Sequence, residues 1–319
     1  MRYALRRCAA GLATLAVLSV LVFVATSVLP GDAASALLGR NATKEALSAL
    51  HHDMGLDRPL LVQYADWMGG LLHGDLGRSV TGYVSGEPVG VWEQISGKLA
   101  NSLTLAVVSF ALIVLASVVL GGYVGLKAGR WQDHLLSTLT LVPSALPEFV
   151  LGALLLGVFF TWLDVLPPVS LIEPGAAPWD EPALLVLPVL TVLGVTVGAA
   201  ARMIRAGMLD ALKAEFVAAA RLNGIPEARV VRRYALRNAL GPGIQVLALI
   251  AQYLVGGLLV VEAMFGYPGI GKELVDAVII HDNTEVRSIT MVLACAYVGL
   301  AILADLLVML VVPKLRTTS

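Results

Sequence analysis

Charged residues are scarce in this sequence. Lys, Arg, Asp and Glu together make up 14% of the 319 residues, whereas hydrophobic residues make up 58%. Soluble domains carry roughly 25% charged residues, so the composition excludes an ordinary soluble protein and indicates a chain that folds in lipid. The formal net charge is only −1, which gives no support for a nucleic-acid-binding protein.

Cysteine is almost absent as well. The two cysteines, Cys8 and Cys295, both lie in or beside apolar runs. Two residues so far apart form neither a disulfide framework nor a metal-binding spacing, and we expect both to be small, buried apolar residues. The sequence also lacks a chain of Asp, Glu and His residues of the kind found in proton pumps, which disfavours a self-sufficient secondary transporter.

Long apolar runs dominate what remains. A helix needs about 20 apolar residues to cross the hydrocarbon layer of a membrane. We predict an all-α polytopic membrane protein with six transmembrane helices, in these runs: Cys8–Gly31, Leu99–Leu126, Leu135–Leu163, Ala183–Ala201, Asn238–Val261 and Ser288–Pro313. The first run is favoured as an uncleaved span, because the apolar part of a secretory signal has only about 7–15 residues. Pro143 and Pro147 predict a kink in the third.

The distribution of Lys and Arg selects the orientation, because cytoplasmic loops carry an excess of both. An even number of spans places both termini on one side. With the termini in the cytoplasm, the cytoplasmic basic residues are Arg2, Arg6, Arg7, Lys127, Arg130, Arg202, Arg205, Lys213, Arg221, Arg229, Arg232, Arg233, Arg237, Lys314 and Arg316. The short outer loops then hold only Lys272 and Arg287, which supports this orientation.

Three parts of the chain follow from the spans. They are the N-terminal tail with the first span (1–29), an outer segment (30–98), and a five-helix core (99–319) that contains a long cytoplasmic loop at 202–242. In the outer segment, Lys44–His52 and Pro59–Leu72 have helical patterns, and the second is amphipathic. The acidic residues of this segment suit a solvated outer face.

The cytoplasmic loop is the most informative stretch. Asn223-Gly224-Ile225-Pro226 interrupts a basic, helix-forming sequence between the fourth and fifth spans. Gly224 permits a left-handed turn at the end of one helix, and Pro226 fits the first position of the next. The loop is too long for an idle connection and predicts a helix pair that seats in a groove of another protein. A helix-turn-helix DNA reader is disfavoured because spans tether both ends, and a solvated loop without a partner stays a further alternative.

One motif is deceptive. Gly266–Lys272 has the spacing of a phosphate-binding P-loop, but Glu273 stands where Ser or Thr would bind Mg²⁺. The motif also follows a membrane span on the outer side, so we reject nucleotide binding and expect a tight turn with a short re-entrant or interfacial piece.

Three acidic residues interrupt the apolar runs: Glu148, Glu262 and Asp305. An acid at the centre of a membrane helix costs roughly 2.5–3.5 kcal/mol, so such residues usually face a cavity or a partner. We interpret them as lining a pathway or pairing between helices, and Glu262 could also reach the membrane surface.

Several segments together resemble the inner-membrane permease subunits of bacterial ATP-binding-cassette importers, in the dipeptide, oligopeptide and nickel group. These are Met54–Tyr64, Gly70–Ser79, Arg202–Leu209, Ala218–Gly224, Arg237–Leu240 and Val261–Gly271. Ala218–Gly224 has the spacing of the EAA loop of that family. Two departures stand out: Ala218 replaces the usual Glu, and Asn283–Arg287 replaces a Tyr-Pro-Val-Val-Gln-like run.

The resemblance implies a permease of the bacterial cytoplasmic membrane and not an enzyme. The EAA helix pair would dock on a cytoplasmic ATPase through Glu215, Ala218, Ala219, Ala220, Arg221, Asn223, Gly224, Ile225, Pro226 and Arg229. The partners implied are a second, similar permease, two ATPase subunits or one fused ATPase, and an extracytoplasmic solute-binding protein that delivers peptides. ATP and Mg²⁺ would bind the ATPase subunits, and this chain would bind no cofactor, metal or nucleotide. Nickel, glutathione or another small solute stays open as cargo.

Overall fold

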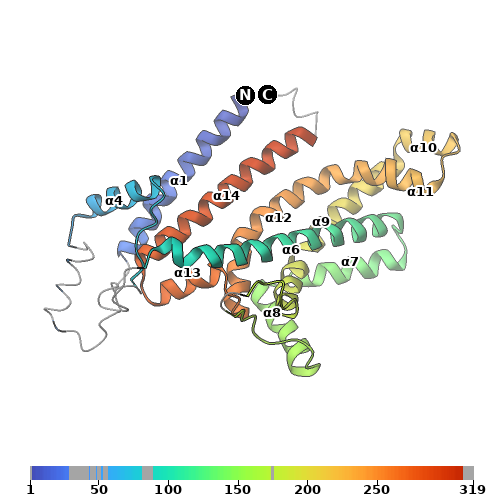
Figure 1. The fold of residues 1–319 in the computed structure, drawn as a ribbon. Helices are drawn as coiled ribbons and strands as arrows, with labels where there is room; N and C mark the ends of the chain where they lie inside the picture. The colour runs from blue at the N-terminus through green and yellow to red at the C-terminus, as the bar shows by residue number, and fades with distance from the viewer. Residues whose placement is uncertain are drawn as a thin grey trace. The chain divides into compact units, whose positions relative to one another are not determined.

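The computed structural model describes residues 2–28, 57–80, 89–173 and 176–311, with the single residues 43, 48 and 52. Apart from Ser48 and His52, the predicted helix at Lys44–His52 therefore lies outside the described residues. The helices in the described part, which confirm the all-α prediction (Figure 1), are α1 (Arg2–Val28), α4 (Leu60–Leu72), α6 (Val91–Leu126), α7 (Trp131–Ser144), α8 (Glu148–Leu156), the π-helix η2 (Gly157–Trp162), α9 (Ala183–Lys213), α10 (Glu215–Leu222), α11 (Glu227–Arg229), the π-helix η3 (Val230–Ala235), α12 (Leu236–Phe265), α13 (Ile270–Ile279) and α14 (Asn283–Val311).

Five helical segments of the described chain are long and apolar enough to cross a membrane: α1, α6, α9, the continuous segment from α11 to α12, and α14. The third predicted span differs. It is divided into α7 and the α8–η2 segment, whose axes differ by 107°. The bend predicted from Pro143 and Pro147 is therefore present, and the described chain has six candidate spans if the two segments count as one broken span. Pro147 precedes α8, and a proline disfavours helical backbone at the residue before it, which ends α7 and lets α8 start in a new direction.

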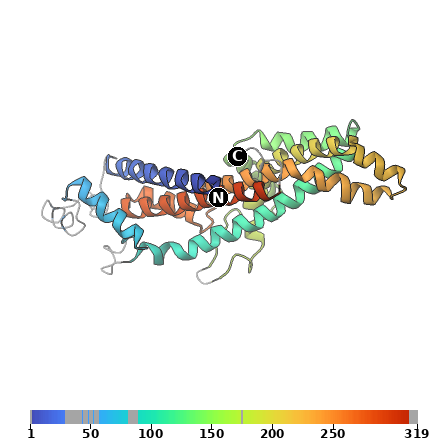
Figure 2. The same ribbon diagram turned by 90° about the horizontal axis from the view of Figure 1, so that it is seen from above.

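Contacts divide the chain into two compact units. The larger unit contains residues 103–267 with residues 1–4 and 299–319, and the smaller unit contains residues 5–102 and 268–298. In the larger unit, α6, α7, α9 and α12 run side by side in both views (Figures 1 and 2). The central member is α9, because 61% of its most apolar stretch is buried.

Glycines allow three helices to approach α9 closely. A Cβ atom at Gly198 of α9 would lie 2.4 Å from the carbonyl oxygen of Thr140 on α7. A Cβ at Gly121 of α6 would lie 2.6 Å from the carbonyl oxygen of Ala201. A Cβ at Gly207 of α9 would lie 2.7 Å from the carbonyl oxygen of Ala239 on α12. Lipid is as apolar as leucine, so helices in a membrane associate through such close contacts of small residues. This packing makes α9 the axis of the larger unit.

The smaller unit combines α1, α4 and α13 with the first part of α6 and of α14. Its apolar core contains Leu76, Val91, Ile95, Ile270 and Ile289. The side chain of Arg287 on α14 joins α1. Its Nε donates a 2.6 Å hydrogen bond to Thr26 Oγ1, a terminal nitrogen donates to Ser27 Oγ at 2.9 Å, and the guanidinium lies 4.2 Å from the centre of the Phe23 ring.

Two local expectations have clear outcomes. At the false P-loop, Gly266 has a left-handed φ of 65° and α13 begins at Ile270, so the segment is a turn followed by a short helix. Cys8 and Cys295 are both exposed, so the expectation that they are buried is wrong. Lipid solvates apolar side chains, and a residue of a membrane span therefore need not be covered by its own chain.

Candidate functional site

The residues predicted to bind a partner lie at one end of the larger unit. At that end α9 leads into α10, the chain turns at Asn223–Pro226, and α11 and η3 lead back into α12 (Figure 1). We name residues 215–235 the elbow.

The turn of the elbow is a Schellman motif. Gly224 has φ 73° and its N–H donates a 3.0 Å hydrogen bond to the carbonyl of Arg221, while the N–H of Ile225 donates to the carbonyl of Ala220 at 3.2 Å. This pair of bonds satisfies the last carbonyls of α10 and needs a left-handed residue. The left-handed turn predicted at Gly224 is therefore present.

The two arms of the elbow share a small apolar core. Val217 and Ala220 of α10 and Val230 of η3 are buried, and Ile225 and Tyr234 pack against them. Ala220 and Ile225, which the sequence suggested as docking residues, are thus buried or half-buried inside the elbow. They fix the angle between the arms, so the elbow forms one packed body.

The second arm differs from the prediction. After the turn, α11 continues through η3 into α12, and the three form one helical segment whose apolar part is long enough to cross a membrane. Pro226 is not the first helical residue but the cap before Glu227. A proline at the cap position lacks only an N–H that no helical carbonyl would accept, so the restart one residue later costs nothing in hydrogen bonding.

One face of α10 is exposed. Glu215, Ala218, Ala219 and Leu222 recur at the spacing that places residues on one helix face, and all four are exposed. Leu222 is 89% exposed and Phe216, beside this face, is 43% exposed. The sequence analysis did not identify Phe216 or Leu222, although apolar residues on a face that otherwise holds small and polar residues were a usable signal. The face combines a flat alanine surface with a projecting leucine.

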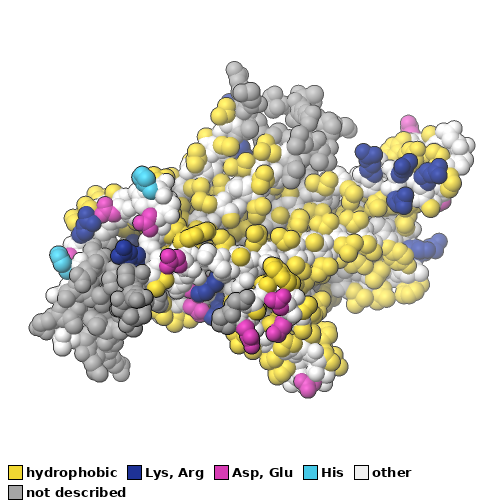
Figure 3. Space-filling model, in the orientation of Figure 1, with side chains coloured by type: hydrophobic (Ala, Val, Ile, Leu, Met, Phe, Trp, Pro, Cys, Tyr) yellow, Lys and Arg dark blue, Asp and Glu magenta, His cyan; other side chains and the backbone are white. Residues whose placement is uncertain are grey.

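Charged groups surround this face. The Arg221 guanidinium forms two hydrogen bonds with the carboxylate of Glu227, of 3.0 and 2.6 Å, across the turn, and this bonding raises the pKa of Arg221. Arg229, Arg232 and Arg233 line a shallow, open hollow on the second arm. Lys and Arg side chains gather over this end of the unit (Figure 3). The elbow therefore presents a basic surface next to the exposed side chain of Leu222.

The base of the elbow is joined firmly to α9 and α12. Met208 and Ala211 near the end of α9 form a buried cluster with Ala235 and Ala239. The Cβ position of Gly207 lies 2.7 Å from the carbonyl oxygen of Ala239. A displacement of the elbow must therefore carry both helices with it.

A buried ion pair adds α7 to this group. Asp133 is only 3% exposed and accepts two hydrogen bonds from Arg205 of α9, of 2.8 Å from Nε and 2.7 Å from a terminal nitrogen. The N–H of Gly129 donates a third bond, of 2.8 Å. Paired forks of this kind are among the strongest polar contacts in proteins. The sequence analysis missed the pair, since nothing local links two residues on different helices.

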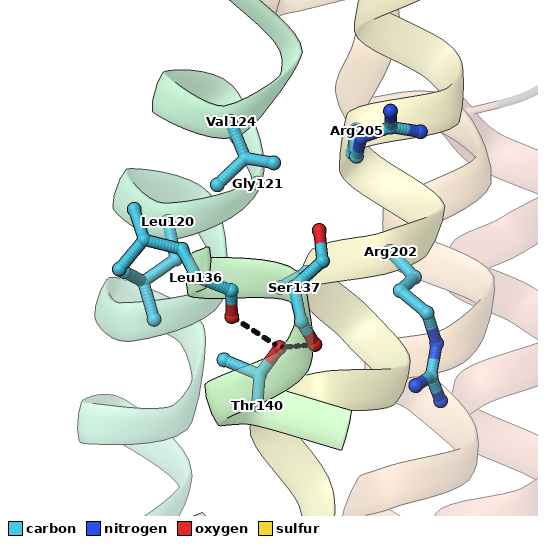
Figure 4. A pocket seen from close by; sticks show the side chains of 9 residues that line it. Leu120, Gly121, Val124, Leu136, Ser137, Thr140, Arg202 and Arg205 are labelled. Atoms are coloured by element: carbon cyan, nitrogen blue, oxygen red, sulfur yellow. Dashed lines mark hydrogen bonds between the residues drawn. The ribbon is translucent and has the colours of Figure 1, made fainter. Parts of the chain in front are cut away.

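A small cavity lies beside Arg205. Gly121 and Val124 of α6, Ser137 and Thr140 of α7, and Arg202 and Arg205 of α9 border it (Figure 4). Its volume is about 10 Å³, close to the minimum for one water molecule. It is too small for a transported solute and marks only the junction of three helices.

The three acids of the apolar runs occupy different environments. Glu148 begins α8 and accepts a hydrogen bond from the hydroxyl of Tyr253 on α12. Glu262 is 1% exposed, so its carboxylate does not reach the surface of the chain. Asp305 lies half-buried on α14. Glu148 thus contacts a second helix, α12, through Tyr253.

The smaller unit holds a buried polar cluster that the sequence analysis did not identify. Asp282 accepts hydrogen bonds from Ser79 Oγ (2.7 Å) and from the N–H of Val80 (2.6 Å). Glu273 pairs with Lys98 and accepts a 3.0 Å bond from Gln94. The bonds of Asp282 tie the segment that follows α4 to the start of α14, and those of Glu273 tie α13 to α6.

Comparisons with known proteins cover nearly the whole chain. Residues 117–317 match the family described as binding-protein-dependent transport system inner membrane component, and residues 1–106 match the N-terminal family of such membrane components. The chain is 32% identical over 316 residues to the glutathione transport system permease protein GsiC of Salmonella typhimurium, covering 99% of each chain. It is 31% identical, with the same coverage, to the protein of that name from Escherichia coli strain K12.

Proposed function

The chain belongs to the family of binding-protein-dependent transport system inner membrane components and is a permease subunit of an ATP-binding-cassette importer, and we propose that its cargo is a peptide. Such a permease is a transport subunit, and ATP hydrolysis takes place on separate subunits. The proposal of peptides rests on the similarity to permeases named for glutathione, which is itself peptide-like. Glutathione is therefore the first alternative cargo, and nickel or another small solute is the second.

We propose the orientation that the basic residues favour. The elbow and both termini would lie in the cytoplasm, in the cytoplasmic membrane of a bacterium, because Lys and Arg are concentrated in the segments on that side. The end of α1 at Val28, and α4 and α13, would then lie on the outer side. A second permease would complete the pathway, and an extracytoplasmic binding protein would deliver the peptide.

The elbow is the proposed docking site for the ATPase. The observation that carries this proposal is the exposed face of α10, with Ala218, Ala219 and the projecting Leu222, on a body joined to α9 and α12. Small residues allow a partner to approach the backbone closely, and exposed apolar surface such as that of Leu222 marks an interaction site. Glu215, Arg221, Asn223, Gly224, Pro226 and Arg229 would border the contact. Movement of the bound ATPases would then pass to α9, and through Arg205 and Asp133 to α7.

Within the membrane, Glu148, Glu262 and Asp305 stay candidates for pathway lining or interhelical contacts. Glu148 has the stronger support as an interhelical residue, because the hydroxyl of Tyr253 bonds to it.

Replacing Gly224 tests the docking proposal. A Cβ atom at Gly224 meets no neighbour within 4 Å, but φ is 73°, a conformation that costs an ordinary residue about 1–2 kcal/mol. We expect Gly224→Val, in proteoliposomes with the partner subunits, to reduce ATP-driven uptake strongly while the complex still hydrolyses ATP. The reason is that the strained turn changes the angle between the two arms.

Asparagine is the matched control at this position, because it tolerates the left-handed conformation. Gly224→Asn should keep most of the uptake, and Leu222→Asp should lose it without any change of backbone. Normal uptake by both Gly224→Val and Leu222→Asp would disprove docking through the elbow.

Cargo identity requires a separate experiment. The intact importer should be purified with its binding protein, and the binding protein titrated with dipeptides, tripeptides, glutathione and nickel. Tightest binding of a peptide supports the proposal, whereas tightest binding of nickel would overturn the cargo and leave the permease assignment intact.

A further inference from the structure

The helix α4 has an unusual composition for a segment in water. Only Asp66 is charged among its 13 residues, Leu60–Leu72. None of the 13 is buried, and Leu61 and Leu72 are 84% and 79% exposed. Contiguous exposed apolar surface on a protein marks an interaction site or contact with a membrane.

The contacts of α4 place it beside the apolar part of α1, which is a membrane span (Figure 1). The rings of Tyr64 and Trp67 lie 5.3 and 6.1 Å from that of Phe23, and the hydroxyl of Tyr64 is 2.9 Å from Ser19 Oγ. Ser19 precedes Val28, the last residue of α1, by a distance of about 14 Å along the helix axis. This is roughly half of the hydrocarbon thickness of a bilayer. The hydroxyl of Tyr64 therefore reaches well below the end of the span.

The remaining surface of α4 divides into two opposite edges. On the polar edge, the guanidinium of Arg58 pairs with Asp66 at 2.5 Å, and the backbone carbonyl of Arg58 accepts a 2.8 Å hydrogen bond from Gln63. On the apolar edge, Leu61 and Leu72 are separated by only about 20° around the helix, and Asp66 and Gln63 lie about 140–160° from Leu61. The edge with Tyr64 and Trp67, which contacts α1, lies between the two. Such a helix lies in a membrane interface with its apolar edge toward the acyl chains.

We propose that α4 lies in one leaflet of the bilayer, with Leu61 and Leu72 in contact with lipid acyl chains and with Gln63 and Asp66 facing water. In the orientation proposed above, this is the outer leaflet. The rings of Tyr64 and Trp67 suit this position, because tyrosine and tryptophan concentrate at membrane interfaces.

Continuity with α1 supports lipid as the occupant. Leu21, Val24 and Val28 of α1 are also exposed, and they belong to a span that must meet lipid or another span. The contacts of Tyr64 and Trp67 with Phe23 attach α4 to this span. A binding protein that arrives from water would meet the opposite edge, with Gln63 and Asp66.

The position of α4 has a consequence for the segment after it. Gly77–Val80 follows α4 closely, and Asp282 holds it through Ser79 and Val80. A helix fixed in the interface would therefore set the depth at which this segment meets the start of α14.

The test uses single cysteines in the intact importer. Cys8 and Cys295 are replaced by serine, and cysteine is introduced at Leu61, Leu72, Gln63 or Asp66, with ATP-driven uptake as a check of assembly. Each variant is labelled with a small fluorophore and reconstituted in liposomes whose acyl chains carry bromine, a quencher that acts on contact. We expect strong quenching at Leu61 and Leu72 and little at Asp66.

A second measurement shows whether lipid, water or protein surrounds the apolar edge of α4. A thiol reagent that cannot cross the membrane should modify Asp66→Cys at least roughly tenfold faster than Leu61→Cys, because burial of a leucine-sized group is worth more than a tenfold step. Fast modification of Leu61→Cys would overturn the proposal in favour of water. Slow modification without quenching would overturn it in favour of a protein contact, from this chain or a partner. Neither result affects the docking role of the elbow, which depends on uptake by the Gly224 and Leu222 variants.

Discussion

Two apolar spans of this protein, α9 and α1, differ sharply in how their own units cover them. In α9, 61% of the most apolar stretch is buried, whereas in α1 the fraction is 11%. Both have high hydropathy, so hydropathy identifies each as a span without indicating its role. Burial separates the roles: α9 is an internal axis within the larger unit, and α1 is a helix whose surface is left for lipid or another chain.

The contacts of the two helices differ in kind. Close glycine contacts and a buried charge pair, Asp133 with Arg205, attach α9 to its neighbours. By contrast, α1 meets Arg287 through hydroxyl groups and the ring of Phe23. Because lipid supplies no hydrophobic drive between helices, the first kind gives a rigid assembly and the second a looser attachment. The proposed transmission of movement from the elbow to α9 requires the first kind of contact.

Gly198→Ala should lower the stability of the protein more than any other substitution considered, because it acts on the close packing of α9. The added Cβ would lie 2.4 Å from both the Thr140 carbonyl oxygen and Ser144 Oγ, and a backbone atom cannot move away without displacing α7. Overpacking typically costs 1–3 kcal/mol, so we expect a loss of about 3 kcal/mol. The measurement is the fraction of detergent-purified complex that stays monodisperse after heating.

Gly256 provides the matched control, since it also lies in a membrane helix but has no atom within 4 Å of its Cβ position. Gly256→Ala should leave stability unchanged or slightly raised, because alanine favours the helix. Equal thermal stability of the two variants would show that α9 is not closely packed.

Asp133→Ala should have the next largest effect. It leaves the guanidinium of Arg205 without its paired acceptor and removes the acceptor of the Gly129 N–H. Hydrogen bonds to charged groups contribute about 1.5–3 kcal/mol, and we expect a loss of about 2 kcal/mol because Arg205 is partly exposed. Thermal stability of the purified complex measures the loss.

The double variant Asp133→Ala with Arg205→Ala is the control. It removes the charge that the single variant leaves uncompensated, so stability should partly return. If the double variant loses the sum of the two single losses, the pair makes no mutual contribution.

The features of this structure differ in how well the sequence predicted them. The spans and the left-handed Gly224 were predictable, because apolar runs and turn residues act locally. The pair of Asp133 with Arg205 joins residues 72 positions apart, and that of Ser79 with Asp282 joins residues 203 apart. Such contacts depend on tertiary packing, which periodicity does not report. The break before Glu148 was partly predictable, because two prolines indicated a bend but not a turn of 107°.

Phe23→Leu tests how strongly α1 is attached to its neighbours. The change keeps an apolar side chain of similar reach but removes the ring below Arg287 and its contacts with Tyr64 and Trp67. A cation–π contact contributes roughly 0.5–1 kcal/mol at exposed sites and more when desolvated, so we expect a loss of about 1 kcal/mol. The same heating assay measures it. A loss as large as that of Gly198→Ala would contradict the difference between α1 and α9.

Glu227→Gln should have the smallest effect, and it shows how far the rigid region extends beyond α9. The carboxylate of Glu227 forms two hydrogen bonds with Arg221, as strong in geometry as those of Asp133. Both partners are exposed, however, and water and salt screen an exposed pair so that it contributes little. We expect no measurable change in thermal stability or in ATP-driven uptake at physiological salt. The elbow would then owe its shape to Val217, Ala220 and Val230, so Val230→Ala should lower uptake where Glu227→Gln does not. The reverse order would mean that an exposed ion pair, and not the apolar core of the elbow, sets the angle between its two arms.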